Sequence, residues 1–270
     1  MTDSGLDAAL PVALAWPPMG PTKTHSSRPD LRAVEAVPKQ VLYVLMETSC
    51  PYLAGRRERK LMTEIHGPDA VGTYGRLSRA GFRRSHNFAY RPACSDCAAC
   101  VPVRVQVDAF KPGPSLRRVA RLNSALRIDD RPPVATEEQY AVFTRYLSSR
   151  HDDGEMAGMS FADYRTMVCD TLLDTRLTEF REPDGRLAAA CLTDWLEDGP
   201  SAVYSFFAPD LAKRSLGTYM VLWLIEAARR HGRPHVYLGY WIADSGKMSY
   251  KTRFRPIEGL GPEGWQPLPA

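Results

Sequence analysis

Three cysteines stand at regular spacing in the first half of the chain, at Cys94, Cys97 and Cys100. A C-x2-C-x2-C spacing is typical of metal ligands rather than of a hydrophobic core. Cys50 supplies a fourth thiol, and four thiolates suit zinc or an iron–sulfur cluster. Reduced thiols packed near a substrate pocket are the alternative interpretation of the same four residues.

A second candidate site lies where an expected strand leads into an expected helix. Its loop contains Lys213 and Arg214, and Gly217 follows in the first helical turn. Glycine allows a ligand to approach the backbone, and free helix N–H groups with two cations favour phosphate. Arg-x-x-Gly at such a junction resembles the pyrophosphate loop of the N-acetyltransferase (GNAT) fold, which binds acyl-CoA between this strand and the next. Tyr219 stands where that fold usually has a small residue.

Aromatic and cationic side chains are mixed near the C-terminus. The aromatic residues are Tyr240, Trp241, Tyr250 and Phe254, and the cations are Lys247, Lys251, Arg253 and Arg255. Aromatic rings stack on bases and cations hold phosphates, so the stretch favours a nucleic acid partner. An aromatic core strand followed by a basic surface loop is the alternative.

The charge distribution points to the same class of partner. The whole chain of 270 residues carries a formal charge of +4, but residues 76–131 hold twelve basic and four acidic residues. A basic stretch inside a nearly neutral protein suggests a polyanionic partner, and the alternative is a solvated, arginine-rich face.

Composition excludes several classes of protein. Hydrophobic residues make up 44% and charged residues 24%, which are values for a globular chain. No stretch approaches the roughly 18 apolar residues of a membrane span, and the N-terminus lacks the basic region of a secretory signal. We therefore expect a soluble cytoplasmic protein, in which six cysteines do not form a disulfide framework. Cys169 and Cys191 are expected to be buried only.

Few periodic elements mark the first half. Six prolines interrupt residues 1–38, which we expect to be a disordered tail. Arg56 to Ile65 is expected to be a short helix, and the alternation from Val101 to Asp108 predicts a strand. Residues 116–127 are expected to form an amphipathic basic helix.

The second half is more regular. Helices are expected from Glu137 to Arg150, after a capping box that starts at Ser160, and at about 215–231. Strands are expected near 176–181, 187–194, 202–207 and 235–240. This order predicts an α+β (mixed α/β) fold, with a mixed sheet covered by helices.

Six runs of sequence together resemble the N-end rule aminoacyl-tRNA–protein transferases, in particular their bacterial aspartate/glutamate leucyltransferase branch. They are Cys50-Pro-Tyr-Leu, Gly81-Phe-Arg-Arg-Ser, Tyr90-Arg-Pro-x-Cys-x-x-Cys-x-x-Cys, Arg150-His-x-Asp-Gly, Arg214-Ser-Leu-Gly and Tyr237-Leu-Gly-Tyr-Trp-Ile…Lys-Met-x-Tyr-Lys. The resemblance covers about residues 39–260. It implies a Cys-bearing N-terminal domain over 39–115, a GNAT-like C-terminal domain over 116–260 and a tail over 261–270.

The resemblance also implies an activity. An aminoacyl group, with leucine favoured, moves from charged tRNA to the α-amine of a protein that begins with Asp or Glu, and so marks it for degradation. Arginine is the alternative transferred residue. An acetyl-CoA-dependent N-acetyltransferase and a non-catalytic RNA-binding module with a zinc knuckle are the rival classes.

Roles for individual residues remain hypotheses at this stage. Lys213, Arg214, Gly217, Trp241, Tyr250 and Lys251 are expected to bind the tRNA acyl donor. Tyr240 and Lys247 are candidates for proton transfer or oxyanion contact, with Asp244 behind them, and structural hydrogen bonding is the alternative. Arg83, Arg84 and Arg91 are expected to recognise the acidic N-terminal residue or to hold tRNA phosphates. His151 and Asp153 orient a substrate or form a structural pair. The chemistry requires no cofactor, because the donor ester is already activated.

Overall fold

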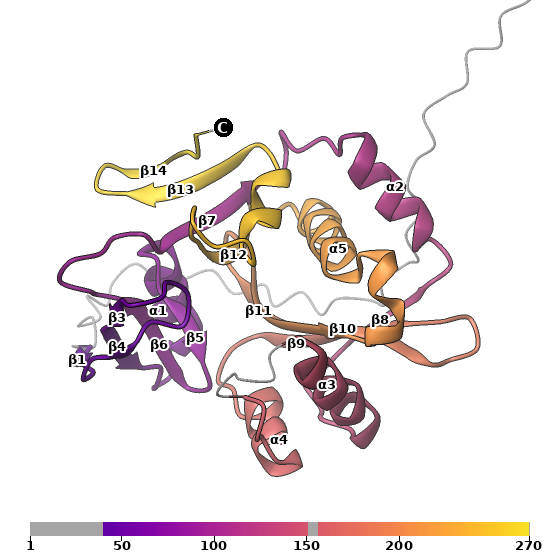
Figure 1. The fold of residues 1–270 in the computed structure, drawn as a ribbon, viewed down its shortest axis with the longest axis horizontal. Coiled ribbons are helices and arrows are strands. Elements are labelled where there is room, and N and C mark those ends of the chain that lie inside the picture. Colours follow the sequence, from indigo (N-terminus) through magenta and orange to yellow (C-terminus); the bar gives the residue numbers. More distant parts are fainter. Residues whose placement is uncertain (1–39, 151–155, 270) are drawn as a thin grey trace, which may run out of the picture.

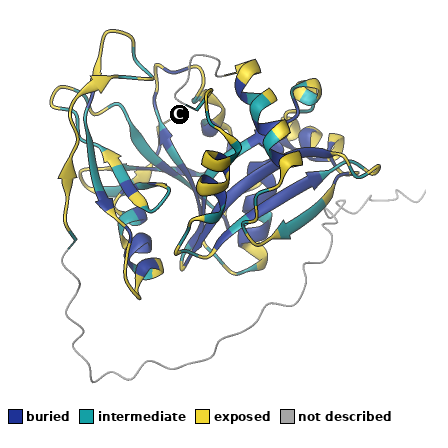
Figure 2. Ribbon diagram, turned by 90° about the horizontal axis from the view of Figure 1, so that it is seen from below, coloured by how far each residue is buried: buried dark blue, intermediate teal, exposed yellow. Residues whose placement is uncertain are grey.

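The computed structural model describes residues 40–150 and 156–269 and contains a small and a large β-sheet, with helices packed around the large one (Figure 1). The expected tail at 1–38, His151 and Asp153 lie outside the described residues. Figure 2 shows that the large sheet is mostly buried, whereas the small sheet and the outer helix faces are more exposed. Within the described residues, no helix is both long and apolar enough to cross a membrane.

The small sheet is antiparallel. Its strands, in the order β1-β4-β6-β5, are Tyr43–Val44, Lys60–Glu64, Phe88–Pro92 and Arg83–Ser85. A separate hairpin pairs β2 (Thr48–Ser49) with β3 (Arg57–Glu58). Helix α1 (Ala70–Arg79) connects β4 to β5.

The short helix expected from Arg56 to Ile65 is wrong, because β3 and β4 occupy this range. Leu61 and Ile65 are spaced for one helical face, but every residue of β4 pairs with β6. The hydroxyl of Thr63 also donates to the carbonyl of Val41. Pairing with distant strands therefore overrides a weak local helical pattern.

The large sheet is mixed and has eight strands. In the order β14-β13-β7-β12-β11-β10-β9-β8, they are Gly264–Pro267, Ile257–Gly261, Val101–Gln106, His235–Trp241, Gly199–Phe207, Leu187–Leu196, Thr175–Arg181 and Arg127–Arg131. Strands β11 and β12 are parallel, and the other pairs of the described sheet are antiparallel.

Helices cover both faces of this sheet. Helices α2 (Pro114–Leu122) and α5 (Leu216–Arg230) lie on one face, and α3 (Glu137–Arg150) and α4 (Phe161–Cys169) lie on the other (Figure 1). Alternate residues of β10 separate the two cores: Cys191 packs with α5, whereas Leu192 packs with α3 and α4. Two 3₁₀ turns, η1 (Pro209–Arg214) and η2 (Ser249–Arg253), follow β11 and β12.

These elements confirm the expected α+β fold, and the predicted strands and long helices of the second half are present. The capping box is confirmed, since Ser160 Oγ accepts from the Asp163 amide and the Asp163 carboxylate accepts from the Ser160 amide. Helix α2 ends five residues earlier than expected. Asn123 follows its last residue, and the Asn123 side-chain amide donates to the carbonyls of Val119 and Arg214.

The sheet does not follow the predicted division at residue 115. Strand β7 lies in the predicted N-terminal unit, yet it pairs with β12 and β13 of the large sheet. The predicted tail at 261–270 contains β14, which closes the edge of the same sheet. Segments from the predicted N-terminal unit and from the predicted C-terminal tail therefore both contribute to the sheet around β12.

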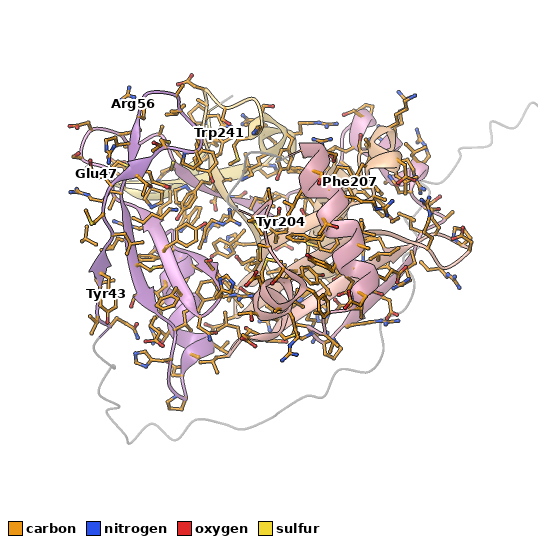
Figure 3. The ribbon with its side chains drawn as sticks, turned by 60° about the horizontal axis from the view of Figure 1, so that its bottom comes forward. Tyr43, Glu47, Arg56, Tyr204, Phe207 and Trp241 are labelled. Atoms are coloured by element: carbon orange, nitrogen blue, oxygen red, sulfur yellow. The ribbon has the colours of Figure 1, made fainter. Side chains whose placement is uncertain are left out.

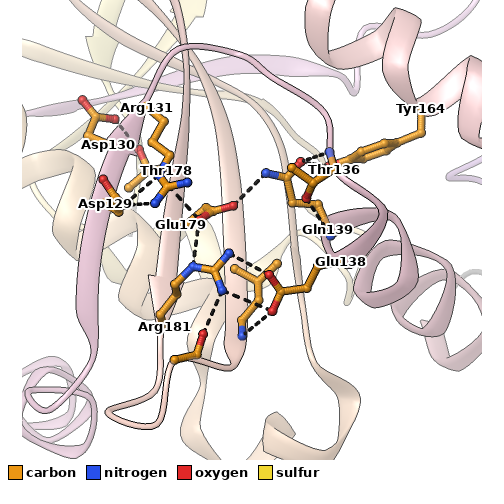
Figure 4. Close-up of polar contacts among 12 residues, drawn as sticks. Asp129, Asp130, Arg131, Thr136, Glu138, Gln139, Tyr164, Thr178, Glu179 and Arg181 are labelled. Carbon is orange, nitrogen blue, oxygen red and sulfur yellow. Dashed lines mark hydrogen bonds and ion pairs between the residues drawn. The ribbon is translucent and has the colours of Figure 1, made fainter.

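A network of charged side chains attaches α3 to the outer strands β8 and β9 (Figure 4). Glu179 of β9 is 1% exposed, and its carboxylate accepts from Gln139 Nε2 at 2.7 Å and from Arg181 Nε at 2.9 Å. Arg181 also donates to Glu138, in the first turn of α3. Each buried charge thus has hydrogen-bond partners, as buried ions require.

The ion pair of Arg84 with Asp194 joins the small sheet to the large one. Arg84 Nε lies 2.7 Å from Asp194 Oδ2, and Nη2 lies 2.9 Å from Oδ1. Both side chains are at most 1% exposed. Arg84 Nη1 donates to the carbonyl of His86, so every guanidinium nitrogen has a partner within the protein. The expectation that Arg84 recognises a substrate acid or phosphate is therefore wrong.

We expect Arg84→Met to lower the free energy of unfolding by about 3–5 kcal/mol, because it leaves the Asp194 carboxylate buried and unpaired. Adding Asp194→Leu removes the orphaned charge and should recover most of that loss. Urea denaturation measures both variants beside Arg91→Met, which alters an exposed arginine and should cost less than about 1 kcal/mol. Equal losses for Arg84→Met and Arg91→Met would contradict this role.

Candidate active site

The parallel strands β11 and β12 are held apart by an arginine from the small sheet. They pair at Ser201 and Tyr237. Beyond that pair, Arg83 of β5 donates from Nη2 to the carbonyls of Ala202 and Val203, both at 3.1 Å. The opposite wall is Gly239 of β12, where a Cβ atom would lie 2.5 Å from Arg83 Cζ. The guanidinium therefore lies between the two strands.

Gly239 makes this close approach possible in two ways. It lacks the side chain that would collide with Arg83, and its φ of +73° is one that L side chains rarely adopt. The register of β12 against β7 shifts at the same point, between Tyr237 and Gly239. In Figure 3, Tyr204 and Phe207 of β11 are separated from Trp241 at the end of β12. The parallel strands of the strand–helix–strand unit thus diverge beyond Ser201 and Tyr237, and the Arg83 guanidinium fills the gap between them.

Lys251 is a buried amine beside this gap. It lies in η2, is 3% exposed, and its Nζ donates to the carbonyl of Tyr240. Burial, and then the positive charge of Arg83, lower the pKa of Lys251 well below its usual value. The expected phosphate contact does not fit a side chain in this position. An amine that loses its proton readily can instead accept one from a reacting group.

Tyr240 does not occupy the position expected of a proton donor. Its hydroxyl lies 3.0 Å from the carbonyls of Gly81 and Tyr90, and the residue is 2% exposed. Burial raises the pKa of Tyr240 far above its usual value. The phenol therefore attaches β12 to the small sheet. Lys247 and Asp244 are exposed on the loop after β12, so the structure does not bring them to the Arg83–Lys251 pair.

The loop before α5 matches its prediction in part. Lys213 is exposed at the end of η1, and the nearest atom to a Cβ at Gly217 would be Phe207 Cε1, 3.8 Å away. The backbone at the helix start is therefore open to a ligand. Arg214 differs from expectation, because its guanidinium is paired with Glu182 and also donates to Asn123 Oδ1. Lys213 and the first turn of α5 remain as anion-binding groups.

The two aromatic candidates lie in different surroundings. Trp241 is half-buried and packs against the core under α5. Tyr250 is 38% exposed, and its ring lies edge-on to Phe254 with centroids 6.5 Å apart. Tyr250 therefore offers the accessible ring surface of the pair.

The three arginines expected to recognise an acid are not brought together. Arg83 lies in the gap between the strands, and Arg84 is sealed against Asp194. Arg91 is exposed on β6, where it lies over the Phe82 ring and donates to the carbonyl of Ala80. The structure thus assigns a separate environment to each arginine.

The four cysteines of the N-terminal unit line one cavity of about 60 Å³. Cys50 comes from the loop between β2 and β3, and the others come from the loop between β6 and β7. Burial, followed by the neighbouring Cys50, Cys94 and Cys97, raises the pKa of Cys100 to about 11. No three or more metal-ligating side chains stand together as a ready site in the described chain. Among the described residues the four thiols therefore do not form a preformed metal site, and a bound metal stays a prediction.

Other functional candidates were missed in the sequence. Arg56 and Glu58 line the same cavity as the four thiols, and Tyr52 lies close enough to Arg83, Cys100 and Glu58 to feel their charges. The charged run from Arg56 to Arg59 indicates a candidate binding site, but these residues fall within the expected helix at 56–65 and were not assigned to a site. Cys191 is buried as expected, and Cys169 is half-buried.

Comparisons with known proteins agree with this architecture. The family model for the N terminus of arginine-tRNA-protein transferase matches residues 48–118, and the model for its C terminus matches 138–261. The chain is 57% identical over 217 residues to an aspartate/glutamate leucyltransferase of Paramagnetospirillum magneticum, covering 80% of this chain and 89% of that protein. It is 54% identical to the protein of that name in Parvibaculum lavamentivorans, covering 84% and 95%.

Solved structures are more distant. L-PGS from Bacillus licheniformis is 16% identical, with a TM-score of 0.45 that covers 60% of this chain and 58% of the other. The sequence relatives are far closer and span most of both chains. The two family-model matches also contain Arg83 and Lys251. The chain therefore belongs to the aspartate/glutamate leucyltransferases, within the aminoacyl-tRNA–protein transferase family.

Proposed function

We infer that this enzyme transfers leucine from leucyl-tRNA to the α-amino group of proteins that begin with Asp or Glu, and so marks them for N-end rule degradation. The observation that carries this function is the 57% identity, over 80% of the chain, to a protein named for that activity. Leucine is favoured over arginine because the relatives are named leucyltransferases. We place the reaction in the cytoplasm, where charged tRNA is found.

The gap between β11 and β12 is the proposed seat of the reaction. An α-amine has a pKa near 7.7–8.0, so a useful fraction is neutral at cellular pH, and the donor is an activated ester. Holding amine and ester together can therefore supply much of the catalysis. The new bond joins the α-nitrogen to the leucyl carbonyl carbon, and the bond that breaks joins this carbon to the ribose oxygen.

Arg83 and Lys251 are suited to the charges that develop. Nη2 of Arg83 donates to carbonyls of β11, and we propose that the guanidinium charge stabilises a negatively charged carbonyl oxygen at the edge of the gap. Lys251 accepts the proton that the attacking nitrogen loses and returns it to the ribose oxygen. This transfer of the leucyl group and of one proton needs no cofactor. The four cysteines remain candidates for binding a metal with another role.

Helix α2 supports the tRNA partner. Arg117, Arg118 and Arg121 are exposed on it. Its two ends lie beside the elements that follow β11 and β12. Asn123 binds Arg214 in the loop before α5, and Ser115 accepts from Arg253 of η2 at 3.5 Å. A tRNA backbone whose phosphates contact these arginines along α2 would therefore end beside the gap between β11 and β12.

The activity is tested by transfer from tRNA charged with labelled leucine or labelled arginine to peptides that begin with Asp, Glu or Ala. Label from leucyl-tRNA on the Asp and Glu peptides alone is the expected result. Transfer from arginyl-tRNA would make the enzyme an arginyltransferase. Acetylation with acetyl-CoA, and no transfer from either tRNA, would replace the proposal with an acetyltransferase.

Lys251→Met should lower the rate of transfer by about 10²- to 10⁴-fold, the usual range for removal of a general base. Affinity for leucyl-tRNA should stay within about two-fold. Lys251→Arg should not restore the rate, because arginine does not give up its proton. Single-turnover transfer and filter binding provide these measurements.

Stability distinguishes this role from a structural one. The pKa of Lys251 is lowered in the folded state, so the unfolded chain binds the proton more tightly than the folded chain does. Burial of Lys251 therefore destabilises the fold at pH values below the pKa that this residue has in the unfolded chain. Lys251→Met should then unfold at the same or higher urea concentration at pH 7. A large loss of stability would show that Lys251 is mainly structural.

Replacing Arg117, Arg118 and Arg121 by Gln should weaken binding of every tRNA. The slope of log affinity against log salt should become shallower by about 1 for each phosphate that the variant no longer neutralises. Arg145→Gln and Arg165→Gln, on helices α3 and α4 of the opposite face, are the matched controls. An unchanged salt slope in the α2 variant would place the tRNA elsewhere.

A further inference from the structure

The cavity beside the four cysteines opens next to the proposed reaction site. It is bounded by the loop between β2 and β3, by the loop before β7, and by Ile242, which directly follows β12. Strand β12 also carries Gly239, which packs against Arg83. A molecule held in the cavity therefore lies beside the C-terminal end of β12, next to the proposed reaction site.

The cavity wall carries charges of both signs. Glu58 is 6% exposed, and its Oε2 lies 3.1 Å from Lys60 Nζ. Arg57 is hydrogen-bonded to Glu47, because its Nη2 donates to the Glu47 carbonyl at 2.7 Å. Arg56 is exposed and makes a longer hydrogen bond, 3.3 Å from Nη1 to the carbonyl of Asp96. A buried carboxylate and an available guanidinium thus line one small space.

These charges complement a residue that carries an amino group and a carboxylate a few bonds apart. We propose that the cavity binds the N-terminal acid of the acceptor protein, with Arg56 paired to its side-chain carboxylate and Glu58 accepting a hydrogen bond from its α-amino group, which attacks in the neutral form. The proposal rests on the proposed function and gives the acceptor its own site, separate from that of tRNA. A guanidinium suits a carboxylate because it donates two parallel hydrogen bonds.

Size and the other arginines agree with this assignment. A water molecule needs about 10–15 Å³ of such space, so the cavity of about 60 Å³ has room for about four to six waters and can admit a small polar group. Arg84 forms a buried ion pair with Asp194, and Arg83 donates hydrogen bonds to carbonyls of β11. Arg91 does not line the cavity. Arg56 is therefore the cation best placed to distinguish an acidic N-terminus from a neutral one.

The test compares Arg56→Gln with Arg165→Gln, a change of an exposed arginine on α4. Peptides beginning with Asp, Asn or Ala are used with leucyl-tRNA. We expect Arg56→Gln to raise KM for the Asp peptide about 10- to 100-fold, with kcat within about three-fold and leucyl-tRNA affinity unchanged. The preference for Asp over Asn should fall by a similar factor. Arg165→Gln should behave as the unaltered enzyme.

A second variant examines the other end of the ligand. Glu58→Gln should weaken binding of a fluorescent Asp peptide, measured by anisotropy without any tRNA, and Glu58→Asp should restore part of it. This measurement reports peptide binding in the cavity independently of leucyl transfer. If the unaltered enzyme transfers no leucine but binds the peptide through Arg56, the proposed function fails, whereas the proposed binding site for an N-terminal acid is supported.

Two results would overturn the proposal. One is an unchanged preference for Asp over Asn in Arg56→Gln, with the unaltered enzyme active. The other is one equivalent of zinc or iron per chain in active enzyme, absent from Cys97→Ser, because a metal held by the four thiols would fill the space assigned to the acceptor.

Discussion

The guanidinium of Arg83 lies between two parallel strands that would otherwise continue to pair, and its bonds to Ala202 and Val203 satisfy carbonyls of β11. This arrangement is possible only because Gly239 offers no Cβ on the facing strand. A gap between β11 and β12 therefore depends on two residues far apart in the sequence. Helix α5 follows β11 after the turn η1, and η2 follows β12, so this one separation positions both sides of the proposed reaction site.

The alternating direction of side chains along β5 explains how Arg83 is held between β11 and β12. Neighbouring residues of a strand point to opposite faces, so Arg83 and Arg84 of β5 leave it in different directions. Arg84 is anchored in the interior by Asp194 of β10, and Tyr240 attaches β12 to the carbonyls of Gly81 and Tyr90. The small sheet thus acts as a rigid support that inserts a cation into the larger one. Lys251, buried beside that cation, is kept readily deprotonated as a consequence.

Much of the fold could be predicted from periodicity, because α3, α5 and the strands from β9 to β12 carry long apolar patterns. The helix expected at 56–65 failed because β4 gains its stability from β6 and β1, which a local pattern does not contain. Residue type singled out Arg83, Lys251 and the cysteines, which the structure brings to the neighbourhood of the proposed site. It did not separate Arg83 from Arg84, or Lys251 from Lys247, since burial and partners decide those roles.

We propose that the aminoacylated end of tRNA enters between β11 and β12. Photo-cross-linking locates it, with leucyl-tRNA in which an amide replaces the reactive ester and the leucine carries a photoreactive diazirine. Mass spectrometry of the cross-linked enzyme locates the leucyl group. We expect labelled peptides from residues 199–207 and 235–253. Labels confined to α3, α4 or the outer strands β8 and β9 would show that the leucyl group binds elsewhere.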